Sequence, residues 1–169
     1  MIPVPLRLIL ASSSEIRAQL LRNAGLRLEI MPAHIDEETA RVALAADGAG
    51  PRDIADELAG MKARQVSGRE ADALVLGCDQ VLDLDGTVFA KPGDPAAARA
   101  QIRALSGRTH RLHSAAVVCR GGVPVWRHVG TARLTMRDLS DAYLEDYVAR
   151  NWESIRHSVG AYKLEEEGV

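Results

Sequence analysis

The pattern of apolar and polar positions divides the chain into short segments of alternating strand and helix character. Short apolar runs, typical of buried strands, cover residues 6–11, 26–31 and 73–77. Apolar residues at helical spacing predict helices over three further segments, residues 13–24, 51–67 and 95–105. Later in the chain, the pattern predicts two strands around a Gly-Gly turn and a last helix, over residues 109–118, 123–136 and 141–150.

Two stretches lack a clear period. Residues 40–50 are rich in Ala, Gly and Asp, and we expect them to be partly mobile. The end of the chain begins as a strand at Ser158 and finishes as an acidic tail. We find no internal repeat and no low-complexity tract.

Three serines stand where the first strand gives way to a helix. Ser12 and Glu15 have the spacing of a capping box, and Gly25 suits the end of the helix. A strand that ends in serines at a helix N-terminus offers N–H groups, hydroxyls and a favourable dipole to an anion, with Arg17 in the first turn. On these residues alone, ordinary helix capping is the favoured explanation, because Ser is a good N-cap.

Asp79 follows the short apolar run that begins at Ala73. We expect it at the carboxyl end of a buried strand, which is where open α/β sheets place their chemistry. The alternative is a structural aspartate whose carboxylate is satisfied by backbone donors.

A motif with a second chemistry follows directly. Asp83 and Asp85, before Gly86 and Thr87, resemble the nucleophile loop of haloacid-dehalogenase-type phosphatases. That family also needs a distant Lys and a later acidic pair. Lys91 is too close to be that Lys, and we find no suitable acidic pair downstream. Asp-Gly is a strong turn signal, so we predict a hairpin here instead.

Other charged residues stand at distinctive places. The acidic loop over residues 32–39 is either a solvated turn or a contact to magnesium or substrate. Lys62 lies near the apolar stripe of its helix, so its head either reaches water or points into a cleft. Lys91 precedes a Pro-Gly turn at a predicted strand end, which would hold it rigidly.

Composition narrows the class of protein. A chain of 169 residues is long enough for one domain with a real core. The net charge of −2 and the 4% aromatic content argue against nucleic-acid binding. The two cysteines, Cys78 and Cys119, suggest buried thiols in a reducing compartment. Residues 1–5 have no signal-peptide character, and no apolar run approaches membrane-spanning length, so we predict a soluble cytoplasmic protein.

Taken in order, several short motifs make the chain resemble the Maf family. They are Leu10–Arg17 with Leu20 and Leu21, Ile35–Glu37, Leu58–Ala59 with Lys62–Ala63, Gly77–Gln80, Lys91–Pro92, Leu105–Gly107 with His110, and Gly160–Tyr162. The resemblance covers nearly the whole chain, residues 1–169, as a single domain. It implies an α/β fold with an elongated mixed sheet flanked by helices, and two lobes around a central cleft. It also implies a nucleoside triphosphate pyrophosphatase of the house-cleaning type, dependent on Mg or Mn and often homodimeric.

The resemblance also implies roles for particular residues. Asp79 would be the general base that activates water, and Glu37 would position the metal or the water. The phosphates would be bound by Ser12, Ser14, Arg17, Lys62 and Lys91, which fits a substrate of charge about −4. Glu37 and Asp79 are the candidate metal ligands.

Substrate choice would depend on Ile16, Gln80 and Glu165. Gln80 and Glu165 are similar to the branch that hydrolyses 7-methyl-GTP rather than to the dTTP/UTP branch. Ile16 departs from both branches, because a cationic methylated base would gain from an aromatic neighbour that isoleucine does not supply.

Two more departures from the family pattern bear on activity. Glu15 stands where the family usually has Pro. Family members usually continue past residues 165–169 with another strand and a C-terminal helix, which this sequence lacks. A nucleotide-binding or division-regulating protein without turnover is therefore an alternative to the pyrophosphatase.

Overall fold

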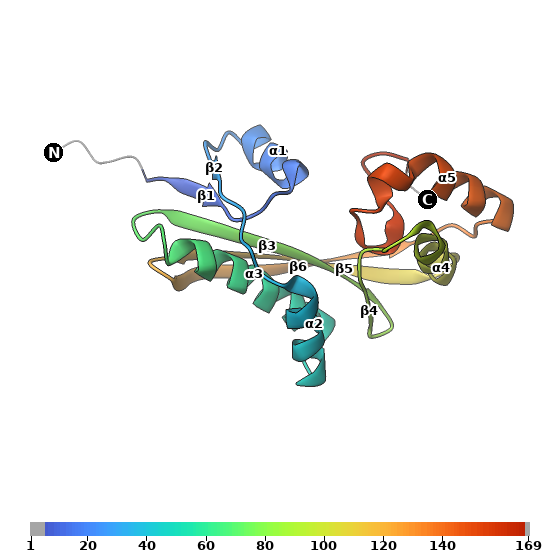
Figure 1. The fold of residues 1–169 in the computed structure, drawn as a ribbon, viewed down its shortest axis with the longest axis horizontal. Helices are drawn as coiled ribbons and strands as arrows, with labels where there is room; N and C mark the ends of the chain where they lie inside the picture. Colours follow the sequence, from blue (N-terminus) through green and yellow to red (C-terminus); the bar gives the residue numbers. More distant parts are fainter. Residues whose placement is uncertain (1–5, 168–169) are drawn as a thin grey trace. The chain divides into compact units, whose positions relative to one another are not determined.

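The structure is a computed structural model that describes residues 6–167 (Figure 1). The expectations for residues 1–5 and for the tail residues 168–169 lie outside the described residues. The chain forms two compact units. Unit 1 comprises Met1–Gln80 and Ser114–Gly130, and unit 2 comprises Val81–His113 and Thr131–Val169.

A mixed six-stranded sheet runs in the order β2-β1-β3-β5-β6, with β4 paired to β3. β1 (Leu8–Leu10) pairs in parallel with β2 (Glu29–Ile30) and with β3 (Leu74–Leu84). β5 (Thr109–Arg120) and β6 (Val123–Thr135) are neighbours joined by the predicted glycine turn. β6 ends the path, and most of its residues are exposed. The predicted α/β class with a mixed sheet is confirmed.

Three helices lie in the described part of unit 1. They are α1 (Glu15–Asn23), α2 (Glu37–Ala46) and α3 (Pro51–Ser67). A small apolar core, which includes Ile9, Val66 and Val75, packs α3 against the parallel strands. Residues 40–50, which we expected to be partly mobile, lie mostly in the helix α2. Asp36 caps the helix by accepting from the Thr39 N–H at 3.0 Å.

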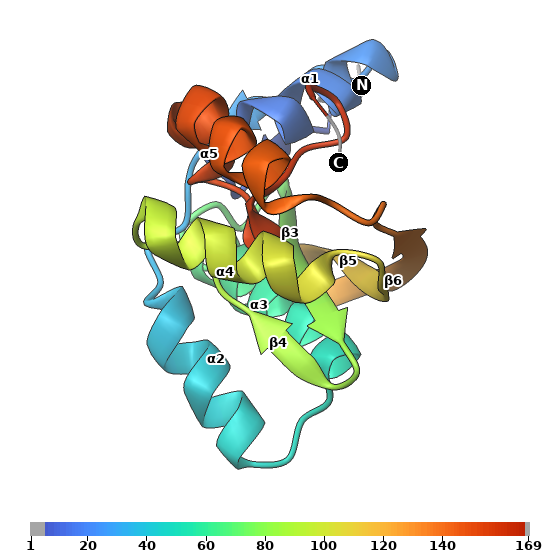
Figure 2. The same cartoon turned by 90° about the vertical axis from the view of Figure 1, so that its right-hand side faces the viewer.

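Unit 2 contains α4 (Pro95–Leu105), α5 (Asp141–Ile155) and the 3₁₀ turn η1 (Val159–Ala161). α4 and α5 are in contact and can be compared in Figures 1 and 2. Ile102, Leu144 and Tyr147 belong to their shared core. The prediction of a strand from Ser158 was wrong. Gly160 and Ala161 adopt left-handed backbone angles, with φ of 80° and 56°, which interrupt an extended chain.

The predicted hairpin after Asp83 is confirmed. β4 (Thr87–Phe89) pairs antiparallel with β3, and Leu84 lies opposite Thr87. Asp85 has a positive φ of 50°, and Asp83 Oδ1 accepts from the Gly86 N–H at 2.7 Å. Asp83 therefore stabilises a turn, which is the structural role expected of an Asp-Gly hairpin.

Candidate active site

The site begins with a close approach between α3 and β3 in unit 1. A Cβ atom at Gly77 would lie 2.1 Å from the Ala59 carbonyl oxygen and 2.6 Å from the Ala63 nitrogen. Only glycine fits there, because real Cβ atoms do not approach backbone so closely. Side chains two residues apart share a face of a strand, so Asp79 also faces α3. Lys62 stands beside Ala63 on α3, and its side chain reaches Asp79.

Lys62 and Asp79 form a buried ion pair. The ammonium Nζ donates to Asp79 Oδ1 at 2.7 Å, and each side chain is only 8% exposed. Glu37, at the first turn of α2, brings its Oε1 to 3.0 Å from the same ammonium. The sequence left open whether the Lys62 ammonium reaches water or points into a cleft, and in the structure it points inward. Two carboxylates thus converge on one buried cation.

Burial raises the pKa of Asp79 above its usual value. The neighbouring Lys62 ammonium opposes this rise through its charge and its hydrogen bond, whereas Glu37 adds to it and Arg17 opposes it. A raised carboxyl pKa moves the group toward the neutral range in which general bases work best. Buried carboxylates with perturbed pKa values are concentrated at functional sites, although structural ion pairs perturb them too.

The sequence predicted that Asp79 lies at the end of its strand, and this prediction was wrong. β3 continues for five residues beyond it, to Leu84. The prediction rested on the apolar run that ends just before Asp79, but β3 also includes the polar residues at 79, 80 and 83. Pairing of β3 with its neighbours continues past them.

A second group of side chains stands at the start of α1. Arg17 Nη1 donates to Ser12 Oγ at 3.2 Å and to the Cys78 carbonyl oxygen at 3.1 Å. Ser12 Oγ also accepts from the Ser14 N–H at 3.2 Å. These contacts join the helix start to β3 at the residue next to Asp79. Hydroxyls, a guanidinium and a helix N-terminus are therefore gathered at one place, as anion binding requires.

The predicted capping box was wrong in its register. Ser14 is the N-cap of α1 and accepts from the Arg17 N–H at 3.5 Å, so Glu15 is the first helical residue. Glu15 pairs instead with Arg22 at 2.8 Å. Ser12 therefore does not cap the helix, and its hydroxyl accepts a hydrogen bond from the Arg17 side chain.

An apolar hollow of about 200 Å³ adjoins this group. It is lined by Arg17, Leu20, Leu21, Leu76, Cys78 and Ala116. The Cys78 and Cys119 thiols are both free; Cys119 is buried as predicted, whereas Cys78 is only half-buried, and burial raises the pKa of each. Sequence reasoning missed Gly77 and the Cys78 carbonyl as parts of the site. The signal for Gly77 was available, since glycine inside a strand often marks a close backbone approach.

A metal would have few protein ligands here. Within residues 6–167, no group of three or more His, Cys, Asp or Glu side chains is arranged to hold a metal ion. Glu37 and Asp79 nevertheless bring oxygens to a common cation, the Lys62 ammonium. Magnesium commonly uses one or two carboxylates and completes its shell with water and substrate phosphates. This donor set fits such an ion.

The remaining predicted residues are placed as follows. Gln80 lies in β3 and its Nε2 donates to Ser114 Oγ at 2.9 Å. Ile16 is exposed on α1. Lys91 and Glu165 belong to unit 2 and are exposed, with Lys91 two residues beyond the end of β4 rather than on a strand. No described contact assigns these four residues a role.

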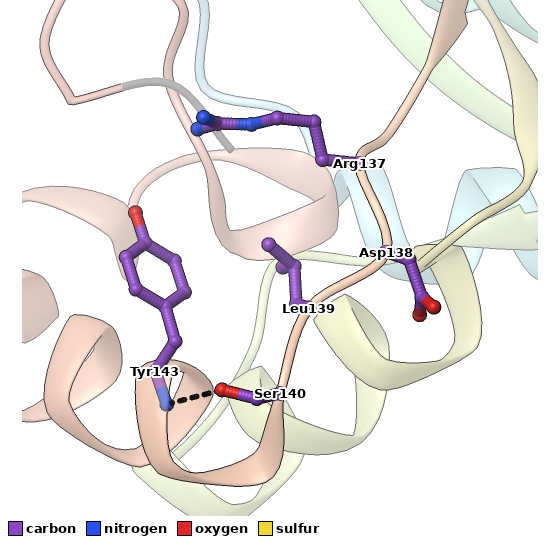
Figure 3. A pocket seen from close by; sticks show the side chains of 5 residues that line it. All are labelled: Arg137, Asp138, Leu139, Ser140 and Tyr143. Carbon is purple, nitrogen blue, oxygen red and sulfur yellow. Dashed lines mark hydrogen bonds between the residues drawn. The ribbon is translucent and has the colours of Figure 1, made fainter.

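Unit 2 has a hollow of its own between β6 and α5. Its volume is about 340 Å³, and it is lined by Arg137, Asp138, Leu139, Ser140 and Tyr143 (Figure 3). The Ser140 hydroxyl accepts from the Tyr143 N–H at 3.2 Å and thereby caps α5. None of the predicted site residues lines this hollow.

No described helix is long and apolar enough to cross a bilayer.

Comparison with solved structures defines the class of fold. A HAM1 protein from Coxiella burnetii is similar, with a TM-score of 0.50 and 16% sequence identity over 76% of this chain and 71% of that one. At this identity the likeness concerns the fold alone. It agrees with the α/β arrangement described above.

Sequence comparison identifies the family. A model of the Maf-like protein family matches residues 7–169, and the chain belongs to this family. A protein of Roseobacter denitrificans named nucleoside triphosphate pyrophosphatase is 61% identical over 166 residues, covering 98% of this chain and 83% of that protein. A protein of Mesorhizobium japonicum named 7-methyl-GTP pyrophosphatase is 48% identical over 163 residues, covering 96% and 82% respectively.

Proposed function

We propose that this chain is a nucleoside triphosphate pyrophosphatase that releases a nucleoside monophosphate and pyrophosphate. The observation that carries the proposal is the buried Asp79 carboxylate, 2.7 Å from Lys62 and beside a group of anion-binding donors. Its family membership and the names of its relatives support the same activity.

Asp79 acts in this proposal as the general base. It takes a proton from a water molecule, and the oxygen of that water attacks the α-phosphorus while pyrophosphate leaves. Such base catalysis is worth roughly 10²–10⁴-fold in rate. The raised pKa of Asp79 suits this role, because a more basic carboxylate is a stronger proton acceptor.

The phosphates are held by cations and hydroxyls. Ser12, Ser14 and Arg17 donate to the triphosphate at the start of α1. Lys62 contributes the charge closest to Asp79, and Lys91 is proposed as a further phosphate-binding charge.

Glu37 and Asp79 are the residues that would hold a divalent ion. The ion, magnesium or manganese, supplies neutralisation of the pyrophosphate leaving group. With two protein carboxylates available, most of its remaining ligands would be water and phosphate oxygens.

The preferred base is proposed from Ile16, Gln80 and Glu165. Gln80 and Glu165 favour a 7-methyl-GTP-type substrate, and a relative at 48% identity carries that name. Ile16 favours neither branch, and the relative at 61% identity carries only the general name. We therefore rank 7-methyl-GTP ahead of dTTP and UTP as the first substrate to try.

Two alternatives are tested together with the proposal. A phosphatase using Asp83 and Asp85 would release orthophosphate, but Asp83 is engaged by the Gly86 N–H and the carboxylate of Asp85 pairs with Arg108. A nucleotide-binding protein without turnover would release neither product.

The experiment is a nucleotide panel with 7-methyl-GTP, GTP, dTTP and UTP in the presence of magnesium or manganese. Pyrophosphate and orthophosphate are measured separately for wild type, Asp79→Asn and Asp83→Asn. We expect pyrophosphate release that Asp79→Asn lowers by at least about 10²-fold and Asp83→Asn leaves largely intact. Orthophosphate release that depends on Asp83 would contradict the proposal, and binding without either product would indicate the non-catalytic alternative.

A further inference from the structure

The Lys62 ammonium occupies the point on which two acidic side chains converge. It lies 3.0 Å from Glu37 Oε1 and 2.7 Å from Asp79 Oδ1. Both carboxylates come from elements of unit 1, one from the first turn of α2 and one from β3. These are the oxygens that would bind a divalent ion, so the ammonium and the ion require the same ligands.

The pair is not a surface contact that rearranges freely. Lys62 and Asp79 are each 8% exposed, whereas Glu37 is 50% exposed. A buried carboxylate without a cation is strongly unfavourable, so Asp79 keeps Lys62 until another cation replaces it. Glu37, with half of its side chain in solvent, can turn toward an arriving ion first.

A lysine displaced from two carboxylates needs a new anionic partner. The triphosphate supplies one, because its charge of about −4 exceeds what a single divalent ion neutralises. The anion-binding group of Ser12 and Arg17 contacts β3 at Cys78, the residue next to Asp79. Arg17 is close enough to Asp79 for its charge to act on that carboxyl group, so a phosphate bound by Arg17 would lie near the Lys62–Asp79 pair.

We propose that Lys62 is an exchangeable counter-ion that couples metal binding to nucleotide binding. In the free protein it neutralises Glu37 and Asp79, and by occupying these carboxylates it lowers their affinity for a metal ion. When the metal and nucleotide bind, the ammonium moves from the carboxylates to a phosphate oxygen, and the metal takes its place. The coupling is reciprocal, so nucleotide raises metal affinity by the same factor by which metal raises nucleotide affinity. This inference rests on the proposed function for the identity of the anion.

The test measures Mn²⁺ binding to the protein without nucleotide, by the loss of the free-ion electron paramagnetic resonance signal. The variants are Lys62→Met and, as a matched control, Lys163→Met. Lys163 also forms an ion pair, with Glu166 at 3.0 Å in unit 2, so both substitutions remove one paired positive charge. We expect Lys62→Met to bind Mn²⁺ at least about tenfold more tightly than wild type, and Lys163→Met to match wild type.

Two further variants separate competition from general effects. Glu37→Gln combined with Lys62→Met removes one of the shared ligands, and we expect it to lose the gained affinity. Lys62→Gln keeps an N–H donor for Asp79 and replaces Lys62→Met if circular dichroism shows that the methionine variant does not fold.

Unchanged Mn²⁺ affinity in folded Lys62→Met or Lys62→Gln overturns the inference, as does an equal gain in Lys163→Met. Because Mn²⁺ binding requires no turnover, this failure is distinct from failure of the proposed function. The latter would appear as absent pyrophosphate release from wild-type protein.

Discussion

At the scale of single residues, unit 2 buries a histidine against a tyrosine. His110 Nε2 and the Tyr162 hydroxyl lie 2.6 Å apart, and their rings meet edge to face. Burial lowers the pKa of His110, with a smaller opposing effect from the backbone at Arg108. Burial raises the pKa of Tyr162 to about 12. Both groups are therefore neutral in the folded protein near pH 7.

This pair predicts a pH dependence of stability. The folded-state pKa of His110 is below its ordinary value of 6.5, so the unfolded state binds more protons in the window beneath 6.5. The free energy of unfolding should consequently fall as the pH drops through that window. Urea denaturation of wild type and His110→Asn between pH 7.5 and 5 checks this. We expect a shallower decline in the variant, and equal slopes would mean that His110 does not contribute.

Single residues also show where sequence reasoning reaches its limit. It predicted Asp79, Lys62 and Glu37 as site residues, and the structure brings these three into one cluster. It misassigned the cap, because Ser12, Ser14 and Glu15 satisfy several capping patterns equally well. Ser14 is the N-cap, and Arg17, whose N–H it accepts, also reaches Cys78 in β3, a contact that local spacing does not encode.

At the scale of elements, the approach of α3 to β3 sets the position of Lys62 beside Asp79. Gly77 permits this approach because a Cβ atom there would meet the backbone of α3. The helix presents small residues, Ala59 and Ala63, at the contact. The position of Lys62 beside Asp79 thus depends on α3 and β3 packing directly against each other, with no side chain between them.

We expect Gly77→Ala to destabilise the fold by about 3 kcal/mol or more, at or above the upper end of ordinary overpacking, because backbone must shift. Gly60→Ala is the matched control. Its added Cβ would meet the ends of the Arg64 and Arg127 side chains at 3.1 and 3.4 Å, which can move. Replacing a helical glycine also gains roughly 0.5–1 kcal/mol. Chemical denaturation measures both, and an equally stable Gly77→Ala would refute the close contact.

Most elements could be predicted from the sequence, because their signals are local. The helices that begin at Pro51, Pro95 and Asp141 start where the pattern predicted. The helix α2 was missed because the Ala-, Gly- and Asp-rich composition of residues 40–50 suggested mobility, although none of the helix's residues is buried. Its stability comes from the Asp36 cap and from contact with α3, which only the fold supplies.

At the scale of the whole molecule, the proposed chemistry makes stability depend on ligand. A ligand that binds only the folded state stabilises it by about 2.7 kcal/mol at 100 times its dissociation constant. For a chain of this size we expect a rise in melting temperature of roughly 5–11 °C. Thermal unfolding with magnesium and an α,β-methylene nucleoside triphosphate measures it. The same nucleoside without phosphates is the control, and an equal shift with that nucleoside would contradict phosphate recognition.

The sequence motifs were sufficient to predict family membership and the mixed sheet. Substrate preference could not be predicted in the same way. Ile16 and Glu165 are exposed, and Gln80 contacts Ser114. Recognition of a base depends on side chains that adjust around the ligand, and residue identity at isolated positions gives little information about that.

β6 has a consequence for how the protein behaves in concentrated solution. It ends the described sheet path and exposes Val123, Val125 and Trp126 by 62%, 58% and 53%. Strands of this kind offer unpaired backbone groups to other chains and promote aggregation. Pro124 and the charged residues Arg127 and Arg133 on the same strand oppose this. Changes at Pro124, Arg127 or Arg133 would therefore alter how much protein stays in solution.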